Sequence, residues 1–388
     1  MSQFGFEAQM RMYGESTQGK SSWPWPVGLD GWRQAAQQML GECAWGYLEG
    51  GAGLADTMKA NREAFRHYRI RSRMMRDVAD RDLSVSILGM EFPVPFLLAP
   101  VGVQAILHRD AELASAKAAA DADIPFILST VSSVPLEQVA QVMGTSVRWF
   151  QLYPGKDTDV IRSFLDRAQA SGYSAVVVTV DTTMLGWREA DLQHAYLPFL
   201  HGEGMANFLS DPAFCSRLTQ SPRENPQAAI QEFLSIYVNP SFTWKQLAEI
   251  RDMTDLPILV KGITHPDDAA RVEAMGLDGV VVSNHGGRQI DGGVAALDAL
   301  VDVRNVVQPD YLVMMDSGIR CAADVTKAMA LGANAVLLGR PYAYALAVGG
   351  REGVVELLHQ WKAELDLQLA LSGHRSLETL NGAHVVRV

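Results

Sequence analysis

Short runs of apolar residues recur along the chain, and segments with a helical spacing of apolar positions separate most of them. The runs are rich in Val, Ile, Leu and Phe and cover residues 96–99, 126–129, 147–153, 175–180, 258–261, 279–283, 311–316 and 335–339. Continuous apolar runs of this length are typical of strands that are buried on both faces, as in a parallel sheet. We therefore expect eight parallel strands.

The segments between these runs predict helices. Apolar positions follow helical spacing over residues 110–121, 157–171, 266–275 and 322–331, and several of these segments end at a glycine. Eight strand–helix units in succession favour a (β/α)8 TIM barrel of the α/β class. An open, doubly wound sheet is the competing architecture. It is disfavoured because no GxGxxG motif lies between a first strand and a helix.

We interpret the chain as a single domain over residues 1–388. Two of its segments are not part of the (β/α)8 barrel itself. An N-terminal helical extension covers residues 1–92, with a helix-like segment at 32–50. The barrel covers residues 93–345, and residues 346–388 form a C-terminal helical segment. A long connection at about 186–243, after the fourth strand, is rich in aromatic residues, which favours order over disorder. We predict that this insert is a lid over the barrel rim.

Composition and charge narrow the function classes. The 388 residues are 48% hydrophobic and 20% charged, and the formal net charge is −11 without a basic tract, which argues against nucleic acid or an anionic membrane as partner. No apolar run is long enough to span a bilayer, and no secretory leader is visible. Three distant cysteines, Cys43, Cys215 and Cys321, are expected to be reduced thiols, which predicts a cytoplasmic protein.

Polar residues and glycines gather at one end of the predicted strands. In strand order they are Pro100 to Gln104; Ser129; Gln151 and Tyr153; Thr179 and Asp181; Lys261; Ser283 to Arg288; Asp316, Gly318 and Arg320; Gly339 and Arg340. The carboxyl ends of the strands of a parallel barrel meet at one rim, where the active sites of this fold are built. We therefore expect these side chains to surround one site.

The most informative segment is Ser283-Asn-His-Gly-Gly-Arg-Gln289, where a buried strand ends in polar residues and breaks at two glycines. His285 can exchange a proton near neutral pH, and the planar guanidinium of Arg288 suits a carboxylate. Asp181 could orient the imidazole of His285 and stabilise its charged form. A base beside a carboxylate clamp indicates proton chemistry on a small organic acid, although a histidine on its own is more often structural.

Several candidates keep an alternative interpretation on the residues alone. Arg188 is either a second carboxylate ligand or a solvated arginine at a helix start. Tyr47 and Tyr153 either bind substrate oxygens or simply pack. Lys261 could form a Schiff base, place a fixed positive charge beside an anionic cofactor, or form a structural ion pair.

Glycines after the last two strands, in Asp316-Ser-Gly-Ile-Arg320 and Leu338-Gly-Arg340, occupy the usual place of a barrel phosphate site. Backbone amides and the two arginines would hold a phosphate there, unless the glycines only form tight turns. Asp191 and His194 have no third ligand at a useful spacing, so no metal site is predicted.

Taken together, these motifs resemble the FMN-dependent L-2-hydroxy acid oxidase and dehydrogenase family over residues 31–373. The segment Ser283-Asn-His-Gly-Gly-Arg-Gln289 is close to that family's active-site signature and is highly specific. The supporting matches are Tyr47-Leu-Glu-Gly-Gly-Ala-Gly53, Leu98-Ala-Pro100, Trp149-Phe-Gln-Leu-Tyr153, Thr179-Val-Asp181, Leu185-Gly-Trp-Arg188, Val260-Lys-Gly-Ile263, Asp316-Ser-Gly-Ile-Arg320 and Leu338-Gly-Arg-Pro341.

The resemblance implies FMN as cofactor and an active enzyme. It implies His285 as the base, Asp181 as the group that stabilises the protonated base, and Tyr153 as the ligand of the substrate hydroxyl oxygen. Arg188, Arg288 and Tyr47 would bind the substrate carboxylate, and Lys261 would stabilise the reduced, anionic flavin. The other implied cofactor-binding residues are Pro100, Val101, Gly102, Ser129, Gln151, Thr179 and Ser283 for the ring, and Asp316, Gly318, Arg320, Gly339 and Arg340 for the ribityl chain and phosphate.

Within that family the chain most resembles the lactate 2-monooxygenases, because of the insert with Tyr196-Leu-Pro-Phe-Leu200 and because Gly102 stands where many relatives carry alanine. The substrates would be L-lactate and O2, and the assembly a homotetramer or homo-octamer. Val131, Met184 and the insert are expected to set the length of the substrate side chain. A simple 2-hydroxy acid oxidase, or a dehydrogenase with another electron acceptor, is the nearest alternative. A lysine-dependent aldolase using Lys261 and a non-catalytic phosphate-binding barrel are the alternatives from other classes.

Overall fold

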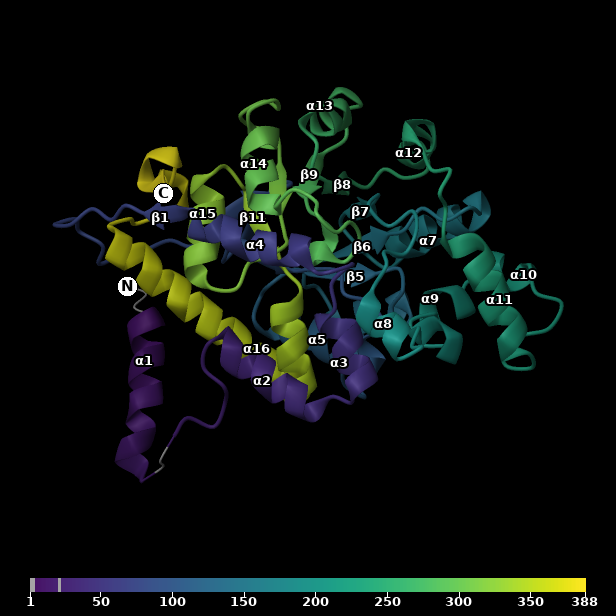
Figure 1. The fold of residues 1–388 in the computed structure, drawn as a ribbon, viewed down its shortest axis with the longest axis horizontal. Coiled ribbons are helices and arrows are strands. Elements are labelled where there is room, and N and C mark those ends of the chain that lie inside the picture. The colour runs from purple at the N-terminus through teal and green to yellow at the C-terminus, as the bar shows by residue number, and fades with distance from the viewer. Residues whose placement is uncertain (1–3, 20–21) are drawn as a thin grey trace.

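The computed structural model describes residues 4–19 and 22–388 and contains a closed barrel of eight parallel strands (Figure 1). The strands follow one another around the barrel in chain order: β4 (Phe96–Leu98), β5 (Phe126–Ser129), β6 (Arg148–Leu152), β7 (Val176–Thr179), β8 (Ile258–Ile263), β9 (Gly279–Val282), β10 (Val313–Met315) and β11 (Ala335–Leu338). Pairing of β11 with β4 closes the barrel. The eight predicted strands and the TIM barrel are confirmed, and the open sheet is excluded.

A helix follows each strand. These helices are α5 (Ala111–Asp121), α6 (Leu136–Met143), α7 (Thr158–Ala170), α12 (Trp244–Arg251), α13 (Pro266–Ala274), α14 (Ala296–Arg304), α15 (Ala322–Ala330) and α16 (Arg340–Ser372). The four helices predicted from apolar spacing have ends within one residue of the observed ones. Local chemistry fixes such ends: at the start of α7 the side chain of Asp157 accepts a hydrogen bond from the backbone N of Val160 at 2.9 Å.

The prediction of a single helix over residues 32–50 is wrong. The segment contains two helices, α2 (Leu29–Met39) and α3 (Glu42–Glu49). Leu40 and Gly41 between them have extended backbone, with ψ of 143° and 159°. Because glycine is unfavourable inside a helix by roughly 1 kcal/mol relative to alanine, Gly41 is a natural point for the break.

The interior of the barrel is apolar towards the amino ends of its strands. Side chains alternate along a strand, so every second residue lies on the same face. One buried cluster is formed by such positions, which are Leu97, Ile127, Trp149, Val177, Leu259, Val281, Met314 and Leu337. A hairpin of β2 (Val85–Ile87) and β3 (Met90–Phe92) adds Ile87 and Phe92 to this cluster and covers the lower end. The prediction that the N-terminal extension is helical is therefore only partly right. The extension also contains this hairpin, which together with the apolar cluster forms the floor of the barrel.

The ends of the chain are attached to the rest of the molecule. β1 (Tyr68–Ile70) pairs antiparallel with β12 (Val385–Arg387), and α1 (Phe4–Gly14) packs on α16. Asp366 of α16 accepts hydrogen bonds from the backbone N of Gly5 at 2.8 Å and from Nε of Arg81 at 2.7 Å.

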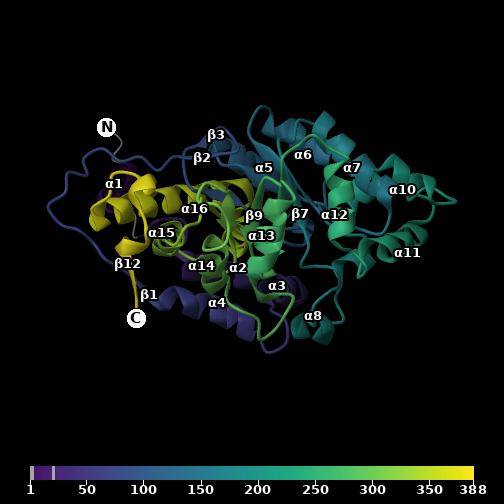
Figure 2. The same ribbon diagram turned by 90° about the horizontal axis from the view of Figure 1, so that it is seen from above.

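The insert folds into α8 (Glu189–Gln193), α9 (Ala206–Leu209), α10 (Pro212–Ser216) and α11 (Pro226–Tyr237), and these helices lie on the opposite side of the molecule from both termini (Figures 1 and 2). Aromatic rings form its core, where the ring of Phe208 lies 4.8 Å from that of Phe233 and 5.5 Å from that of Phe214. Asn207 fastens the insert to the barrel by accepting from the backbone N of Leu136 and donating to the carbonyl O of Thr130. The insert is thus ordered, as its aromatic content predicts. Within the described ranges, no helix is both long enough and apolar enough to cross a membrane.

Candidate active site

A polar layer lies directly above the apolar floor inside the same barrel. Its members stand two residues beyond floor positions and therefore share their strand face; they are Ser129, Gln151, Thr179, Lys261, Ser283 and Asp316. The strand register places Ser129 beside Gln151, and Thr179 beside Lys261. All six are buried. Because a buried polar group is costly unless it has a partner, this layer is a site rather than a solvated surface.

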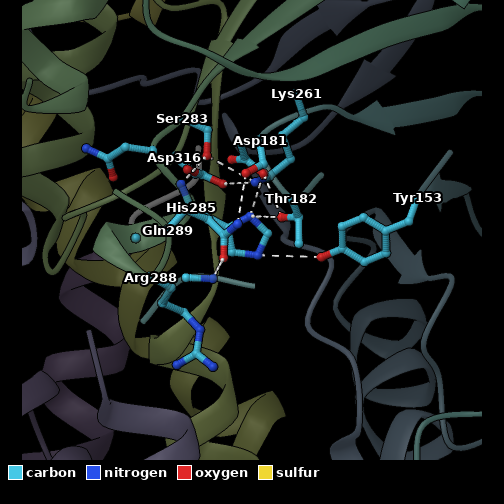
Figure 3. Close-up of polar contacts among 12 residues, drawn as sticks. Tyr153, Asp181, Thr182, Lys261, Ser283, His285, Arg288, Gln289 and Asp316 are labelled. Carbon is cyan, nitrogen blue, oxygen red and sulfur yellow. Dashed lines mark hydrogen bonds and ion pairs between the residues drawn. The ribbon is translucent and has the colours of Figure 1, made fainter. Parts of the chain in front are cut away.

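His285 is hydrogen-bonded on both sides of its ring (Figure 3). Its Nδ1 lies 2.8 Å from Oδ1 of Asp181 and 3.3 Å from Oγ1 of Thr182. Its Nε2 faces the hydroxyl group of Tyr153 at 3.5 Å. The carboxylate favours the tautomer with the proton on Nδ1, which leaves Nε2 free to accept a proton. Thr182 was not selected from the sequence, since a threonine beside an aspartate carries no signal of its own.

The ionisation states of this pair suit a proton acceptor. Burial lowers the pKa of His285, and the neighbouring Asp181 only partly opposes this effect, so the imidazole is neutral near pH 7. Burial acts to raise the pKa of Asp181, but His285 and Lys261 outweigh it and the pKa is lowered. A neutral base is thus held beside an ionised acid that can stabilise the imidazolium formed when His285 takes a proton.

The loop after β9 holds His285 in an uncommon backbone conformation. His285, Gly286 and Gly287 have φ of +57°, +65° and +75°. A non-glycine residue in this region is strained, and such residues are concentrated at functional sites. Asn284 stabilises the loop, because its Oδ1 accepts from the backbone N of Gly287 at 3.1 Å and its Nδ2 donates to Oδ1 of Asn61 at 2.8 Å.

A β-bulge makes room for Asp181. The register between β8 and β9 shifts between Lys261 and Ile263. Gly262 has φ of +105°, and a Cβ atom there would lie 2.7 Å from Cβ of Asp181. The motif Val260-Lys-Gly262 therefore contributes twice, because the glycine leaves the space that the carboxylate occupies.

Arg188 and Arg288 line the same cavity and bring two positive charges to it. The guanidinium of Arg288 lies over the ring of Tyr47, 4.9 Å from its centroid, and donates to the carbonyl O of Gly50 at 3.0 Å. Arg188 donates to the carbonyl O of Arg288 at 3.1 Å and to Oε1 of Gln289 at 2.9 Å. Burial, and then Arg188, lower the pKa of Arg288 to about 9. Two adjacent cations, of which Arg188 is buried and Arg288 partly buried, favour binding of an anion such as a carboxylate.

Asp191 lies beside this arginine pair. Its Oδ2 is 3.9 Å from Nη1 of Arg188. In the part of the chain that the structure describes, no group of three or more His, Cys, Asp or Glu residues is placed to hold a metal ion.

Lys261 is paired within the polar layer. Its Nζ donates to Oγ of Ser283 at 3.0 Å and lies 3.1 Å from Oδ2 of Asp316 (Figure 3). Burial acts to lower the pKa of Lys261, but Asp316 and Asp181 outweigh it and the pKa is raised. A Schiff-base lysine needs a neutral amine, so this environment disfavours an aldolase and favours a fixed positive charge.

One cavity of about 1120 Å³, including its open mouth, joins most of the predicted site residues. The predicted residues that do not line it are Ser129, Gln151, Thr179, Asp181 and Ser283. Phe199 and Tyr237 of the insert also line it, and their distance along the chain hid them from sequence reasoning. Val131 lines the cavity as expected, whereas Met184 does not and is 60% exposed.

The far end of the cavity is lined by Gly318, Arg320, Gly339 and Arg340. The long helix α16 begins at Arg340 after a glycine without a capping side chain, so its first amides are available to an anion. Burial, and to a smaller extent Arg340, lower the pKa of Arg320 to about 10, and Arg320 has no ion-pair partner in the described ranges. The guanidinium of Arg340 is engaged with backbone carbonyl groups, including that of Leu48 at 3.1 Å. The backbone amide of Arg340 would therefore serve a phosphate better than its side chain.

The polar layer contains buried atoms that lack a protein partner. Nε2 of Gln151 and Oγ1 of Thr179 have no hydrogen-bond partner among the residues described. Such atoms are costly in a folded protein, and a ligand bound against this layer would satisfy them. An isoalloxazine edge carries N–H and C=O groups, and a phosphate suits Arg320 and the start of α16, so the residues present fit FMN.

Comparisons with known proteins agree with this fit. A family model described as FMN-dependent dehydrogenase matches residues 36–387. An L-lactate oxidase of Lysinibacillus sphaericus (strain C3-41) is 38% identical over 364 residues, which are 94% of each chain. The FMN-dependent alpha-hydroxy acid dehydrogenase qulF of Penicillium citrinum is 41% identical over 349 residues, which are 89% of this chain and 87% of that one.

Solved structures agree as well. An active mutant of (S)-mandelate dehydrogenase superposes with a TM-score of 0.85 at 35% identity, over 93% of this chain and 99% of that one. Mandelate oxidase with (S)-4-hydroxymandelic acid superposes with a TM-score of 0.82 at 37% identity, over 91% and 97% of the two chains.

The family match and the relatives make this protein an oxidoreductase that uses FMN. The family match spans nearly the whole chain, and the chain belongs to the FMN-dependent dehydrogenase family. Its chemistry is the FMN-dependent oxidation of a 2-hydroxy acid.

Proposed function

We propose that this protein is an L-lactate 2-monooxygenase, which converts lactate and O2 to acetate, carbon dioxide and water. The observation that carries the oxidation step is the neutral His285, held by Asp181, facing a cavity that two arginines also line. A small 2-hydroxy acid presents a carboxylate for the arginines and a proton for the base.

Bound FMN supplies the acceptor for the two electrons that leave the substrate. Arg188 and Arg288 bind the substrate carboxylate, and Tyr47 helps to hold Arg288 in place. Nε2 of His285 accepts a proton from the substrate, and Asp181 stabilises the resulting cation. Tyr153 hydrogen-bonds the hydroxyl oxygen, for which burial keeps it protonated by raising its pKa.

Residues from all eight strands hold the cofactor in this proposal. Those for the ring are Pro100, Val101, Gly102, Ser129, Gln151, Thr179, Lys261 and Ser283, and those for the ribityl chain and phosphate are Asp316, Gly318, Arg320, Gly339 and Arg340. The raised pKa of Lys261 keeps its ammonium group charged, so that it stabilises negative charge on the reduced ring.

The insert supports the monooxygenase outcome. Phe199 and Tyr237 form part of the cavity wall, and ring contacts to Phe233 at 5.2 and 4.9 Å hold them in a packed aromatic core. The insert, through Phe199 and Tyr237, thus forms a fixed roof over the cavity, and such a roof slows the release of pyruvate. O2 would take up the two electrons and two protons removed from lactate and give hydrogen peroxide. The peroxide would then add to the C2 carbonyl of the retained pyruvate; the O–O bond breaks, the C1 carboxylate leaves as carbon dioxide, and acetate and water remain.

The alternative is a 2-hydroxy acid oxidase that releases pyruvate and hydrogen peroxide. The similarity to the L-lactate oxidase of Lysinibacillus sphaericus supports it. A dehydrogenase that passes electrons to another acceptor is the third outcome, and the similarity to the Penicillium citrinum protein supports that.

Product analysis separates these outcomes. The purified protein is mixed with L-lactate in air, and acetate, pyruvate and peroxide are quantified. Acetate as the main product supports the proposal, pyruvate with equal peroxide establishes the oxidase, and flavin reduction without oxygen use establishes the dehydrogenase.

A variant pair tests the role of the roof. We expect Phe199→Leu, at the cavity wall, to raise pyruvate and peroxide at the expense of acetate. Phe214→Leu is the matched control, because Phe214 is fully buried in the same insert but does not line the cavity. Equal product ratios in the two variants would remove the roof from the explanation.

We further propose a cytoplasmic location and a homotetramer or homo-octamer. The three cysteines are free thiols, which is consistent with a reducing compartment. Light scattering of the purified protein measures the assembly size directly.

A further inference from the structure

The side chain of Glu112, near the start of α5, is a buried carboxyl group outside the site described above. It is fully buried, and no ion pair involves it in the ranges that the structure describes. Its Oε1 accepts hydrogen bonds from the backbone N of Gln104 at 3.1 Å and of Ser133 at 3.0 Å, and its Oε2 is buried without a hydrogen-bond partner. A buried carboxylate without a cation is destabilising, so its presence calls for a reason.

The two amides belong to two loops that together form one wall of the cavity. Gln104 follows Val101, Gly102 and Val103, which line the cavity after β4, and Ser133 follows Val131, which lines it after β5. Glu112 therefore joins the two loops from behind through a single oxygen atom.

The wall is strained at one residue and tight at another. Val103 has φ of +58°, a left-handed conformation in which a β-branched residue is a clear outlier. The backbone N of Val103 donates to the carbonyl O of Val131 at 2.8 Å, and the next amide, that of Gln104, is held by Glu112. A Cβ atom at Gly102 would lie 2.6 Å from Cγ2 of Val131, so the two loops are packed too closely for a larger residue at this position.

A second set of hydrogen bonds holds the carbonyl side of the same loop. Nε2 of Gln104 donates to the carbonyl O of Val101 at 2.9 Å, and Oε1 of Gln104 accepts from Oγ of Ser115 at 2.7 Å. The hydroxyl of Tyr342 donates to the carbonyl O of Ala99 at 2.9 Å. With Glu112, these contacts fix the backbone of the wall from the end of β4 onward.

We propose that Glu112 is a positioning residue for the cofactor, whose carboxyl group holds the wall of Val101–Val103 and Val131 in the conformation that FMN binds. The proposal rests on the assignment of Val101 and Gly102 to the flavin ring under the proposed function. It goes beyond that function because Glu112 touches neither substrate nor cofactor. It also makes the wall sensitive to pH, since a neutral carboxyl group is a weaker acceptor for the two amides than a carboxylate.

The surroundings of Glu112 support a change of charge near neutral pH. Burial raises the pKa of Glu112 to about 7, and the hydrogen bonds from Ser133 and Gln104 oppose this only in part. The titratable group that faces it from α16 is Tyr342, whose pKa burial and Glu112 both raise. Charged side chains on α5 and on the elements packed around it pair with one another instead: His108 with Asp110, Lys117 and Arg351 with Asp121, and Glu137 with Arg167.

The first test removes the acceptor and measures FMN binding without substrate. Apoprotein is titrated with FMN by fluorescence at pH 8, and the absorbance spectrum of the bound flavin is recorded. We expect Glu112→Ala to weaken FMN binding by about tenfold or more, the order of one net hydrogen bond, and to shift the spectrum. Glu112→Gln keeps an acceptor for the two amides, so we expect its affinity to stay within about threefold of the original. An unchanged affinity and spectrum in Glu112→Ala would overturn the proposal.

The second test uses pH. For the original protein we expect FMN affinity to fall by up to about threefold as pH is lowered from 8 to 6, with a single titration, because the protonated carboxyl group is then a neutral acceptor like the amide of Glu112→Gln. Glu112→Gln cannot ionise, so we expect its affinity to be flat over the same range. Persistence of the titration in Glu112→Gln would show that another group is responsible and would contradict the pH sensitivity. If Glu112→Ala does not fold, the proposal is tested by this comparison of pH dependence between the original protein and Glu112→Gln.

A matched control separates positioning from general stability. Asp366 is also a buried carboxylate that accepts a backbone N–H, but it lies between α1 and α16, away from the cavity. We expect Asp366→Asn to destabilise the apoprotein and to leave the FMN spectrum and its pH dependence unchanged. Equal changes in both variants would reduce Glu112 to a structural role. Because none of these readouts involves substrate, they stand whether the reaction yields acetate or pyruvate.

Discussion

The lower and upper layers of the barrel interior are carried by the same strands and lie only two residues apart along each of them. Below, positions such as Ile127, Trp149 and Val281 are apolar and fully buried under the β2–β3 hairpin. Above, the corresponding positions Ser129, Gln151 and Ser283 are equally buried but polar. The lower layer gains stability from burial, whereas the upper layer places polar atoms where burial is unfavourable.

The difference shows how this fold tolerates a costly site. Strands whose lower layer is packed in the apolar cluster can carry unpartnered polar atoms and buried charges in the upper layer without losing their register. Substitutions in the lower layer should therefore change stability and leave the chemistry intact. Substitutions in the upper layer and on its loops should do the opposite. The following experiments test that division, from the largest expected effect to the smallest.

The largest effect is expected for His285, the proposed base, which lies above the polar layer. His285→Gln should keep the yellow cofactor but slow the reduction of the flavin by L-lactate about 10²–10⁴-fold, because a positioned base contributes that much. Anaerobic stopped-flow absorbance measures the rate. His374→Gln is the control, since His374 is buried away from the cavity and does not line it. Normal reduction kinetics in His285→Gln would refute its role as base.

The next effect is on stability and belongs to the lower layer. Ile127→Ala should lower the free energy of unfolding of the apoprotein by about 2–5 kcal/mol, because it leaves a cavity in a fully buried cluster. The FMN spectrum and the rate of flavin reduction should not change. Urea denaturation gives the first quantity and stopped-flow the second. A variant that kept its stability but lost activity would break the proposed division.

Two arginines at opposite ends of the cavity should separate substrate from cofactor. Arg288→Met should weaken substrate binding by roughly 10–100-fold, as expected for loss of hydrogen bonds to a charged group, with little change for FMN. Arg320→Met should do the reverse. Titrations of each variant with FMN, and then with a non-reacting 2-hydroxy acid analogue, measure both affinities. Equal losses in Arg288→Met would assign that residue to the cofactor.

A smaller effect is expected for the unpartnered hydroxyl of the polar layer. Thr179→Val keeps the shape of the side chain and removes Oγ1, which has no partner among the described residues. The apoprotein should be as stable or more stable by up to about 1 kcal/mol, while FMN affinity should fall by about threefold to tenfold. A loss of apoprotein stability without loss of FMN affinity would contradict the assignment.

The smallest effect is a shift in the pH profile of flavin reduction. The pKa of His285 is lowered from its ordinary value of 6.5 by burial, so the neutral base persists below that pH. With FMN at saturating concentration, so that cofactor affinity does not enter, the reduction rate should be constant above pH 7 and should fall only as the pH drops through the lowered pKa of His285. Rates measured from pH 5 to 9 test this. A decline that begins above pH 7 would show that the histidine is protonated too easily to fit the buried site.

The sequence predicted the eight strands and the polar residues at their carboxyl ends, because both follow from apolar runs of strand length and from the polar residues that end them. It could not predict features that depend on distant segments. The β2–β3 strands have three residues each, too few for a period, and Gly41 looked like one glycine in a helix. Glu112 resembled an exposed residue on an alanine-rich helix, since nothing local shows that Gln104 and Ser133 point at it.

The seam at which the barrel closes has a consequence for folding kinetics. β11 pairs with β4 although the other six barrel strands lie between them along the chain, and contacts between such distant segments form slowly. The residues assigned to FMN stand on both sides of this seam, with Val101 and Gly102 after β4 and Gly339 after β11. Tight binding of FMN should therefore lag behind the appearance of helices during refolding. The absorbance change of the bound flavin would then report when β11 pairs with β4 and the barrel closes.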